Sequence, residues 1–133
     1  MEERENRLGV TMELLTFLEN DDLENFNENM SISAVEEKDS KGFTILHLAV
    51  LREKYDFVDA LMYYGADPNV ENKNHETPLH IAAKLDSDEI FKLLWDYGAD
   101  LDQENYKGQT PKDIAEENHC KKVLKVIEEI EED

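Results

Sequence analysis

A seven-residue motif recurs at a fixed distance along this chain. Residues 77–83 read Thr-Pro-Leu-His-Ile-Ala-Ala, residues 44–50 read Thr-Ile-Leu-His-Leu-Ala-Val, and residues 110–116 read Thr-Pro-Lys-Asp-Ile-Ala-Glu. Each motif begins 33 residues after the previous one. A period of this length is typical of solenoids, in which each unit buries its apolar face against its neighbours. The period therefore predicts a solenoid.

Cap and turn residues divide each unit into two helices. A threonine before the first helix is expected to act as the N-cap, and a proline at the first helical position loses no hydrogen bond. A glycine after the second helix suits the left-handed position at which helices commonly end. Because apolar residues recur at helical spacing between these signals, the sequence predicts an all-α fold. The residues in these roles are Thr44, Thr77, Thr110, Pro78, Gly65 and Gly98.

The motifs predict one domain, residues 1–133, of four helix–turn–helix units. Two units are complete, at residues 39–71 and 72–104. Degenerate units at 8–38 and 105–130 are expected to cap the stack, since a terminal unit must present a polar outer face to water. The first unit is a residue short before residue 39, so we expect an irregular connection there. Residues 131–133 form an acidic tail, and the like-charged run from residue 128 is expected to be solvated and disordered.

These residues resemble the ankyrin repeat. The resemblance rests on Asp-x-x-Gly-x-Thr-x-Leu-His-x-Ala at 39–49, on Thr-Pro-Leu-His-x-Ala-Ala at 77–83, and on Gly-Ala-Asp at 65–67 and 98–100. It covers residues 8–130 and is closest to a small stand-alone protein with two full repeats between degenerate caps. It implies an α-solenoid of antiparallel helix pairs, with finger-like turns projecting at right angles to the helices.

The resemblance also assigns a role to the two histidines of the motif. In ankyrin-like repeats a histidine at the position of His47 and His80 ties adjacent fingers together through backbone hydrogen bonds. We prefer this structural role to a metal pair or a catalytic base. The family favours glycine between the two helices of a repeat, where this chain has Glu53, Asp86 and His119, so we expect those turns to be strained or differently shaped.

The sequence contains no pattern that indicates catalysis or a metal site. His119 and Cys120 are neighbours, but no second ligand cluster accompanies them, and zinc sites need about four ligands at recognisable spacing. A glycine-rich phosphate loop, a nucleophile elbow and a His-Glu-x-x-His motif are all missing. We therefore predict no enzyme, no metal and no cofactor.

The net charge of −19 is extreme for 133 residues. It favours solubility and repels nucleic acid and anionic membranes, so direct binding to either is not expected, and the free protein is expected to be monomeric. The N-terminus does not read as a signal peptide, and no apolar stretch approaches the roughly 20 residues that span a bilayer. With a single cysteine, the chain is predicted to be cytoplasmic, or nuclear through a partner.

Partners of ankyrin-like folds usually lie against the fingers and the exposed side of the first helices. Of the variable positions there, Phe43, Leu51, Leu85 and Tyr106 predict an exposed apolar row suited to binding hot spots. The alternative is that Leu51 and Leu85 pack beneath the turns. The predicted partner-binding residues are Lys41, Phe43, Leu51, Arg52, Asn74, Glu76, Lys84, Leu85, Tyr106 and Lys107.

The resemblance and the charge together predict a protein-binding module that sequesters or inhibits its partner. The expected partner has a basic or a mixed basic and apolar surface. The alternative is an acidic mimic that blocks a nucleic-acid-binding site on its partner. Residues 61–69 also resemble the asparagine-hydroxylation sites of ankyrin repeats, which makes Asn69 a possible site of modification. Inhibitor, immunity protein, adaptor and effector all remain open.

Overall fold

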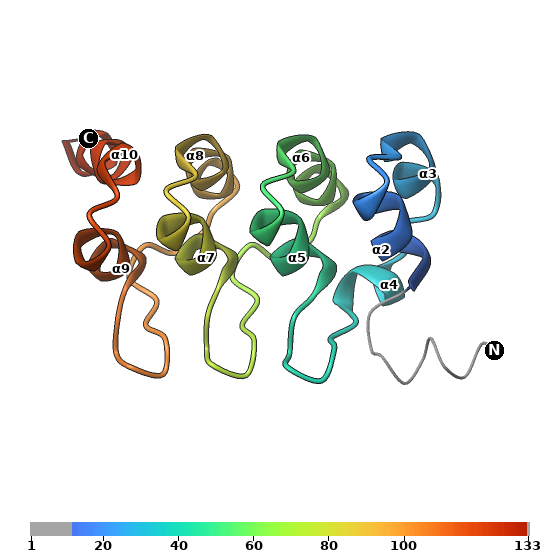
Figure 1. Cartoon of the computed structure of the whole chain (residues 1–133), viewed down its shortest axis with the longest axis horizontal. Helices are drawn as coiled ribbons and strands as arrows, with labels where there is room; N and C mark the ends of the chain where they lie inside the picture. Colours follow the sequence, from blue (N-terminus) through green and yellow to red (C-terminus); the bar gives the residue numbers. More distant parts are fainter. Residues whose placement is uncertain (1–11, 133) are drawn as a thin grey trace.

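The computed structural model describes residues 12–132, and the regular structure within them is helical throughout. Figure 1 shows helix pairs standing side by side in a row, with loops that all extend from the same side of the row. The all-α solenoid predicted from the period is therefore confirmed. The helices are α2 (Met12–Glu19), α3 (Leu23–Glu28), α4 (Ile32–Glu36), α5 (Ile45–Leu51), α6 (Tyr55–Tyr64), α7 (Pro78–Lys84), α8 (Asp88–Asp96), α9 (Pro111–Glu117) and α10 (Lys121–Glu132).

The helices form two layers that run the length of the stack. Helices α2, α5, α7 and α9 contact one another in order and form the inner layer, which lies next to the loops. Helices α3, α6, α8 and α10 form the outer layer in the same way. Apolar side chains fill the space between the layers. Within the outer layer, the rings of Phe26 in α3 and Phe57 in α6 meet edge to face, with centroids 4.9 Å apart. Burial between successive units therefore holds the solenoid together.

The cap residues of the motif occupy the positions that their chemistry favours. The side chains of Thr44, Thr77 and Thr110 each accept a hydrogen bond from the backbone N–H three residues later, at the start of α5, α7 and α9. Gly65 follows α6 with φ of 109°, in the left-handed region that glycine enters without steric cost.

The turns between the paired helices contain the strain expected from their lack of glycine. Glu53, Asp86 and His119 have φ of 55°, 56° and 55°, and Asp21 has φ of 57° at the same point of the first unit. A non-glycine residue in the left-handed region costs about 1–2 kcal/mol. Asp86 offsets part of this cost, because its Oδ1 accepts a hydrogen bond from the Val123 N–H at the start of α10, 2.9 Å away.

A short helix, α4, lies between α3 and the finger at residues 39–43, where the next two units have their Gly-Ala-Asp connections. Ser31 caps α4, since its hydroxyl oxygen accepts a hydrogen bond from the Ala34 N–H at 3.1 Å. Ala34 and Val35 are buried, and α4 packs against α5. The irregular connection expected before residue 39 is thus a single helical turn that closes one end of the core.

The expected disorder from residue 128 is wrong for the residues that the structure describes. Helix α10 continues to Glu132 because Ile127 is buried in the core and because Lys112 Nζ lies 3.1 Å from Glu131 Oε1. Residues 131–132 therefore belong to the helix and not to a tail. Residues 8–11 of the predicted first unit and residue 133 lie outside the described part of the chain.

Candidate functional site

Within residues 12–132, three finger turns project from the inner layer, at residues 39–43, 72–76 and 105–109. Each finger closes through a backbone hydrogen bond from its first residue to its fifth, with lengths of 2.9, 3.0 and 2.9 Å along the chain. The fingers are also joined to one another. The Lys73 N–H donates to the Lys41 carbonyl, and the Tyr106 N–H donates to the Asn74 carbonyl, each at 3.0 Å. The fingers therefore form one connected ledge beside the inner helices.

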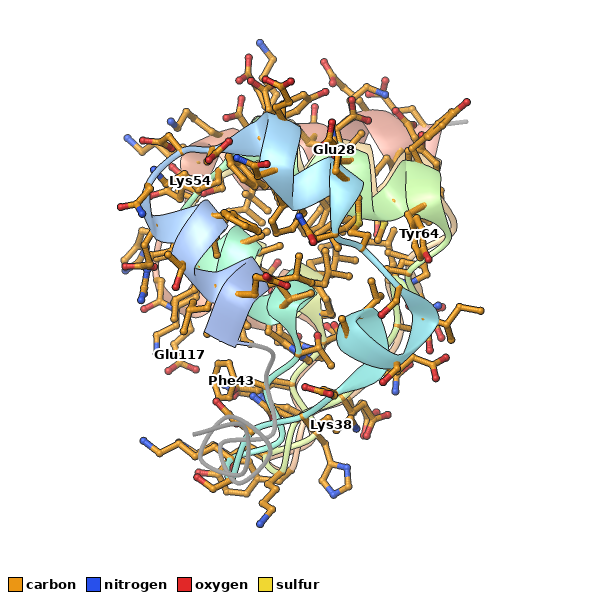
Figure 2. All side chains as sticks on the ribbon, turned by 90° about the vertical axis from the view of Figure 1, so that its right-hand side faces the viewer. Glu28, Lys38, Phe43, Lys54, Tyr64 and Glu117 are labelled. Carbon is orange, nitrogen blue, oxygen red and sulfur yellow. The ribbon has the colours of Figure 1, made fainter. Side chains whose placement is uncertain are left out.

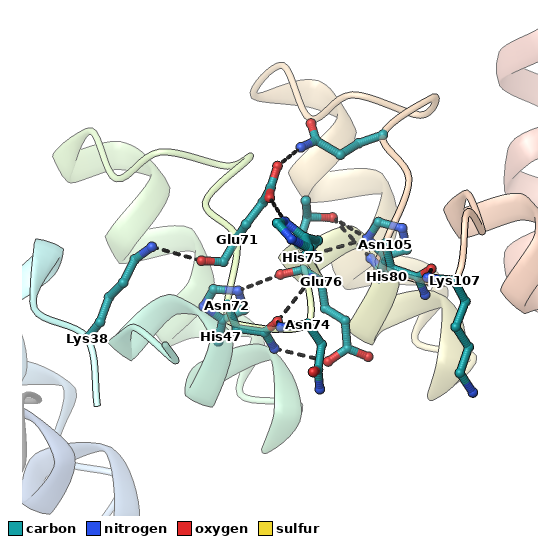
Figure 3. A network of polar contacts seen from close by, with 12 residues as sticks. Lys38, His47, Glu71, Asn72, Asn74, His75, Glu76, His80, Asn105 and Lys107 are labelled. Atoms are coloured by element: carbon teal, nitrogen blue, oxygen red, sulfur yellow. Dashed lines mark hydrogen bonds and ion pairs between the residues drawn. The ribbon is translucent and has the colours of Figure 1, made fainter. Parts of the chain in front are cut away.

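The two histidines of the motif also connect the fingers, as Figure 3 shows. His47 Nε2 lies 3.0 Å from the carbonyl oxygen of Glu76, and His80 Nε2 lies 2.9 Å from that of Gln109. The Nδ1 of each ring accepts the backbone N–H of the capping threonine at 3.1 Å, so Nε2 carries the proton and donates. In the fourth unit Asp113 stands at the position of the histidine. It still exchanges hydrogen bonds with the capping Thr110, but among the described residues it bonds to no other finger.

Burial lowers the pKa of His47 and His80 below 6.5. Protonation would also place a hydrogen on Nδ1, which already accepts a backbone N–H. Both rings are therefore neutral and hold structure rather than transfer protons. Within residues 12–132, no three His, Cys, Asp or Glu side chains are grouped as metal ligands would be.

A groove lies between the second and third fingers and helices α7 and α9. Its volume is about 310 Å³. The structure brings five of the predicted partner-binding residues into its lining: Asn74, Glu76, Lys84, Tyr106 and Lys107. The other residues that line the groove are Asn105, Gln109, Ile114, Glu117 and Asn118.

The groove is lined mainly by polar side chains of both charges around one aromatic ring. Tyr106 is 61% exposed, and Lys107 Nζ lies 5.7 Å from the centre of its ring, within cation–π range. Elsewhere in the lining, Gln109 Nε2 donates to Glu117 Oε2 at 2.7 Å. Such a lining can form directional hydrogen bonds and ion pairs, with Tyr106 as the apolar anchor.

The remaining predicted residues lie outside the groove, and the exposed apolar row is not continuous. Phe43 is half-buried, with its ring 5.5 Å from that of His47, and Leu85 is half-buried because it packs against the core beneath the turn after α7. Leu51 remains 40% exposed. Of the four apolar residues, Leu51 and Tyr106 are the exposed ones.

The two predicted charged residues outside the groove, Lys41 and Arg52, differ in their surroundings. Lys41 is exposed at the tip of the first finger. Arg52 is engaged, because its Nε lies 2.7 Å from Glu19 Oε1 in the first unit. A partner that used Arg52 would first have to displace this ion pair.

The predicted binding residues leave out five that line the groove, among them Asn105 and Ile114. Asn105 begins the third finger, and its Oδ1 accepts the Lys107 and Gln109 N–H groups at 2.9 and 3.0 Å. The 33-residue period could have identified it, because Asp39 and Asn72 accept the same bonds in their own fingers. Ile114 follows the apolar pattern of a core residue and gave no separate signal.

Asn69 lies in the segment that joins α6 to the second finger. Its Oδ1 accepts the Asp100 N–H at 2.7 Å, and its Nδ2 donates to the Gly98 carbonyl at 3.3 Å. Both ends of the amide are therefore bonded to the next unit. The side chain therefore joins two successive repeats.

A family model described as ankyrin repeats (3 copies) matches residues 46–132. The comparison with curated proteins gave no match. Among residues 12–132, none of the helices has the length and hydropathy to cross a membrane.

Proposed function

Because this chain belongs to the ankyrin-repeat family, whose repeats indicate a protein–protein interaction module, we propose that it binds one protein partner in the groove and along the finger turns, and so sequesters or inhibits it. Family members are generally non-catalytic, which agrees with a role in binding. The observation that carries the proposal is the groove itself, in which Tyr106 stands among polar groups of both charges. Aromatic anchors with a polar surround are typical of binding hot spots.

The partner is proposed to have a basic or a mixed basic and apolar surface. The net charge of −19 attracts a basic partner over long distances and raises its association rate. Inside the groove, Glu76 and Glu117 can pair with cations, while Lys84 and Lys107 select against a uniformly basic patch. The same net charge opposes self-association, so the free protein is proposed to be a monomer.

Affinity capture from the native host tests the proposal, with two variants as parallel baits. Glu117→Lys reverses a charge in the groove, and Glu129→Lys makes the same change of net charge on the exposed side of α10. We expect the partner to be captured by the wild type and by Glu129→Lys, and to be depleted with Glu117→Lys. Equal capture by both variants would reject the groove as the binding site.

The net charge also supports a second candidate, an acidic mimic that blocks a nucleic-acid-binding site on its partner. A mimic would replace phosphate contacts, so its affinity would fall steeply as salt is raised. The lysines of the groove argue against a regular array of carboxylates there. A measurement of affinity against ionic strength separates the two candidates: a steep loss favours the mimic, and a shallow one favours the mixed groove.

Asn69 is proposed as a modification site in a host that has an asparagine hydroxylase of the ankyrin type. Its resemblance to such sites supports the proposal, and so does its place in the connection between two repeats. Intact-mass analysis of the protein from such a host tests it. The added mass of one oxygen atom on Asn69 is the expected result, and an unmodified residue would reject the proposal.

A further inference from the structure

A group of tyrosines is exposed on the outer layer, away from the groove. Tyr63 and Tyr64 end helix α6, and Tyr97 follows helix α8. Together with Leu23 and Met30 they line a shallow hollow of about 630 Å³. Figure 2 looks along the stack and labels Tyr64 on the side opposite Glu117 of the groove. The hollow is thus a second surface of the same solenoid.

The packing of the fold does not account for the exposed side chain of Tyr63. Its side chain is 86% exposed, the highest value among the large apolar and aromatic residues of the described chain. The same position is Asp96 in the next repeat and Glu129 in the last one, so the fold does not need an aromatic ring there. An exposed aromatic ring beside apolar residues is typical of a binding surface.

Carboxylates without cationic partners border the hollow. Asp56 and Asp59 both line it, and they share one face of α6 with Tyr63, at spacings of three and four residues. Neither aspartate has a lysine, arginine or histidine within 4.0 Å among the described residues. The pKa of the neighbouring Tyr55 is raised by partial burial and by the negative charges of Asp59, Glu89, Asp96 and Asp56. Negative potential therefore extends over the outer face of α6 and α8.

From these features we infer a second binding surface, the tyrosine face, formed by Tyr63, Tyr64 and Tyr97 with Asp56 and Asp59. It binds an arginine- or lysine-bearing segment of a protein partner that also presents apolar side chains. A guanidinium or ammonium group pairs with the aspartates and stacks on a tyrosine ring, while an apolar side chain enters beside Leu23 and Met30. A second copy of this chain does not fit, since two molecules of charge −19 repel each other.

Two short fluorescent peptides of equal length and charge test the assignment by anisotropy at physiological salt. One alternates arginine with leucine, and the other alternates arginine with serine. We expect the arginine–leucine peptide to bind the wild type at least about tenfold more tightly, because it alone fills the apolar hollow. Substituting Tyr63→Ser and Tyr97→Ser together, which leaves the net charge unchanged, should remove most of that preference. Tyr64 is kept, because its hydroxyl lies 3.5 Å from the Met30 carbonyl and contributes to the fold.

Two matched controls separate the tyrosine face from general attraction and from the groove. Asp56→Asn with Asp59→Asn should weaken binding more than Glu128→Gln with Glu129→Gln, which gives the same net charge on the exposed side of α10. Tyr106→Ser in the groove should leave the preference for the leucine peptide intact. Equal affinity for the two peptides, or equal losses from the two charge pairs, would overturn the inference. A loss with Tyr106→Ser alone would instead place the peptide in the groove and leave the proposed function standing.

Discussion

His80 Nε2 donates a hydrogen bond to the carbonyl oxygen of Gln109, 29 residues further along the chain and in the next finger, at 2.9 Å. His47 and Glu76 repeat this relationship one unit earlier at 3.0 Å. These bonds, together with the backbone bonds between fingers, position the ledge on which the groove is built. The stability of the repeats and the geometry of the binding surface are therefore linked through two buried imidazoles.

The variant His80→Gln is expected to lower the free energy of unfolding by about 1–3 kcal/mol, because it leaves buried donors and acceptors without partners. The control is Asp113→Ala, which removes a cap but no bond to a further finger, and should cost about 1 kcal/mol or less. Denaturant titration followed by circular dichroism measures both. A loss for His80→Gln no larger than for Asp113→Ala would contradict the tying role.

Stability is expected to fall as the pH is lowered below 6.5. Burial depresses the pKa of His47 and His80 in the folded protein, so the unfolded chain takes up protons first and the stability present above 6.5 is lost. The slope is at most about 1.4 kcal/mol per pH unit for each histidine. In urea titrations at a series of pH values, His80→Gln should show a smaller slope than the wild type. Parallel slopes would show that His80 does not titrate differently on folding.

Gly42→Ala and Gly108→Ala form a matched pair at equivalent positions of the first and third fingers. Both glycines have positive φ, 85° and 75°, so each substitution costs about 1 kcal/mol in backbone strain. A Cβ on Gly42 would also lie 2.7 Å from the backbone nitrogen of Lys73, whereas one on Gly108 meets nothing closer than 3.9 Å. Gly42→Ala should therefore destabilise the protein distinctly more, as judged by the melting temperature. Equal shifts in melting temperature would show that the first two fingers are not closely packed.

His119→Gly is expected to stabilise the protein by about 0.5–1 kcal/mol. His119 is exposed and has φ of 55°, so glycine relieves strain, although it also adds entropy to the unfolded chain. The comparison is Asp86→Gly, which relieves the same strain but removes the cap on Val123, so its gain should be smaller or absent. Chemical denaturation distinguishes the pair; a destabilised His119→Gly would mean that the turn is not strained.

The sequence was sufficient for the repeat architecture because the strongest signals are local. Thr44 and His47 lie three residues apart, and the hydrogen bonds between them depend only on the start of one helix. The period then places the same arrangement at Thr77 and His80. Helix α4 was not predicted as a helix, since its core contribution, Ala34 and Val35, is too short to show a helical period.

The sequence predicted which side of the stack a surface residue lies on, but not how exposed its side chain is. The period placed Tyr106 and Lys84 correctly on one side of the stack, and both line the groove. It did not show that Leu85 packs inward and that Arg52 pairs with Glu19, because both depend on neighbouring units. The tyrosine face was missed although the period carries a signal for it, since the position of Tyr63 is occupied by Asp96 and Glu129 in the later units.

The most direct test of the proposed binding site is the dissociation constant of the captured partner for the wild type and for Tyr106→Ala, measured by isothermal titration calorimetry. Tyr106 is the exposed aromatic side chain of the groove, and its removal takes away the anchor without changing the net charge. The dissociation constant is expected to rise at least about tenfold while the melting temperature stays the same. An unchanged dissociation constant would contradict the assignment of the groove as the binding site.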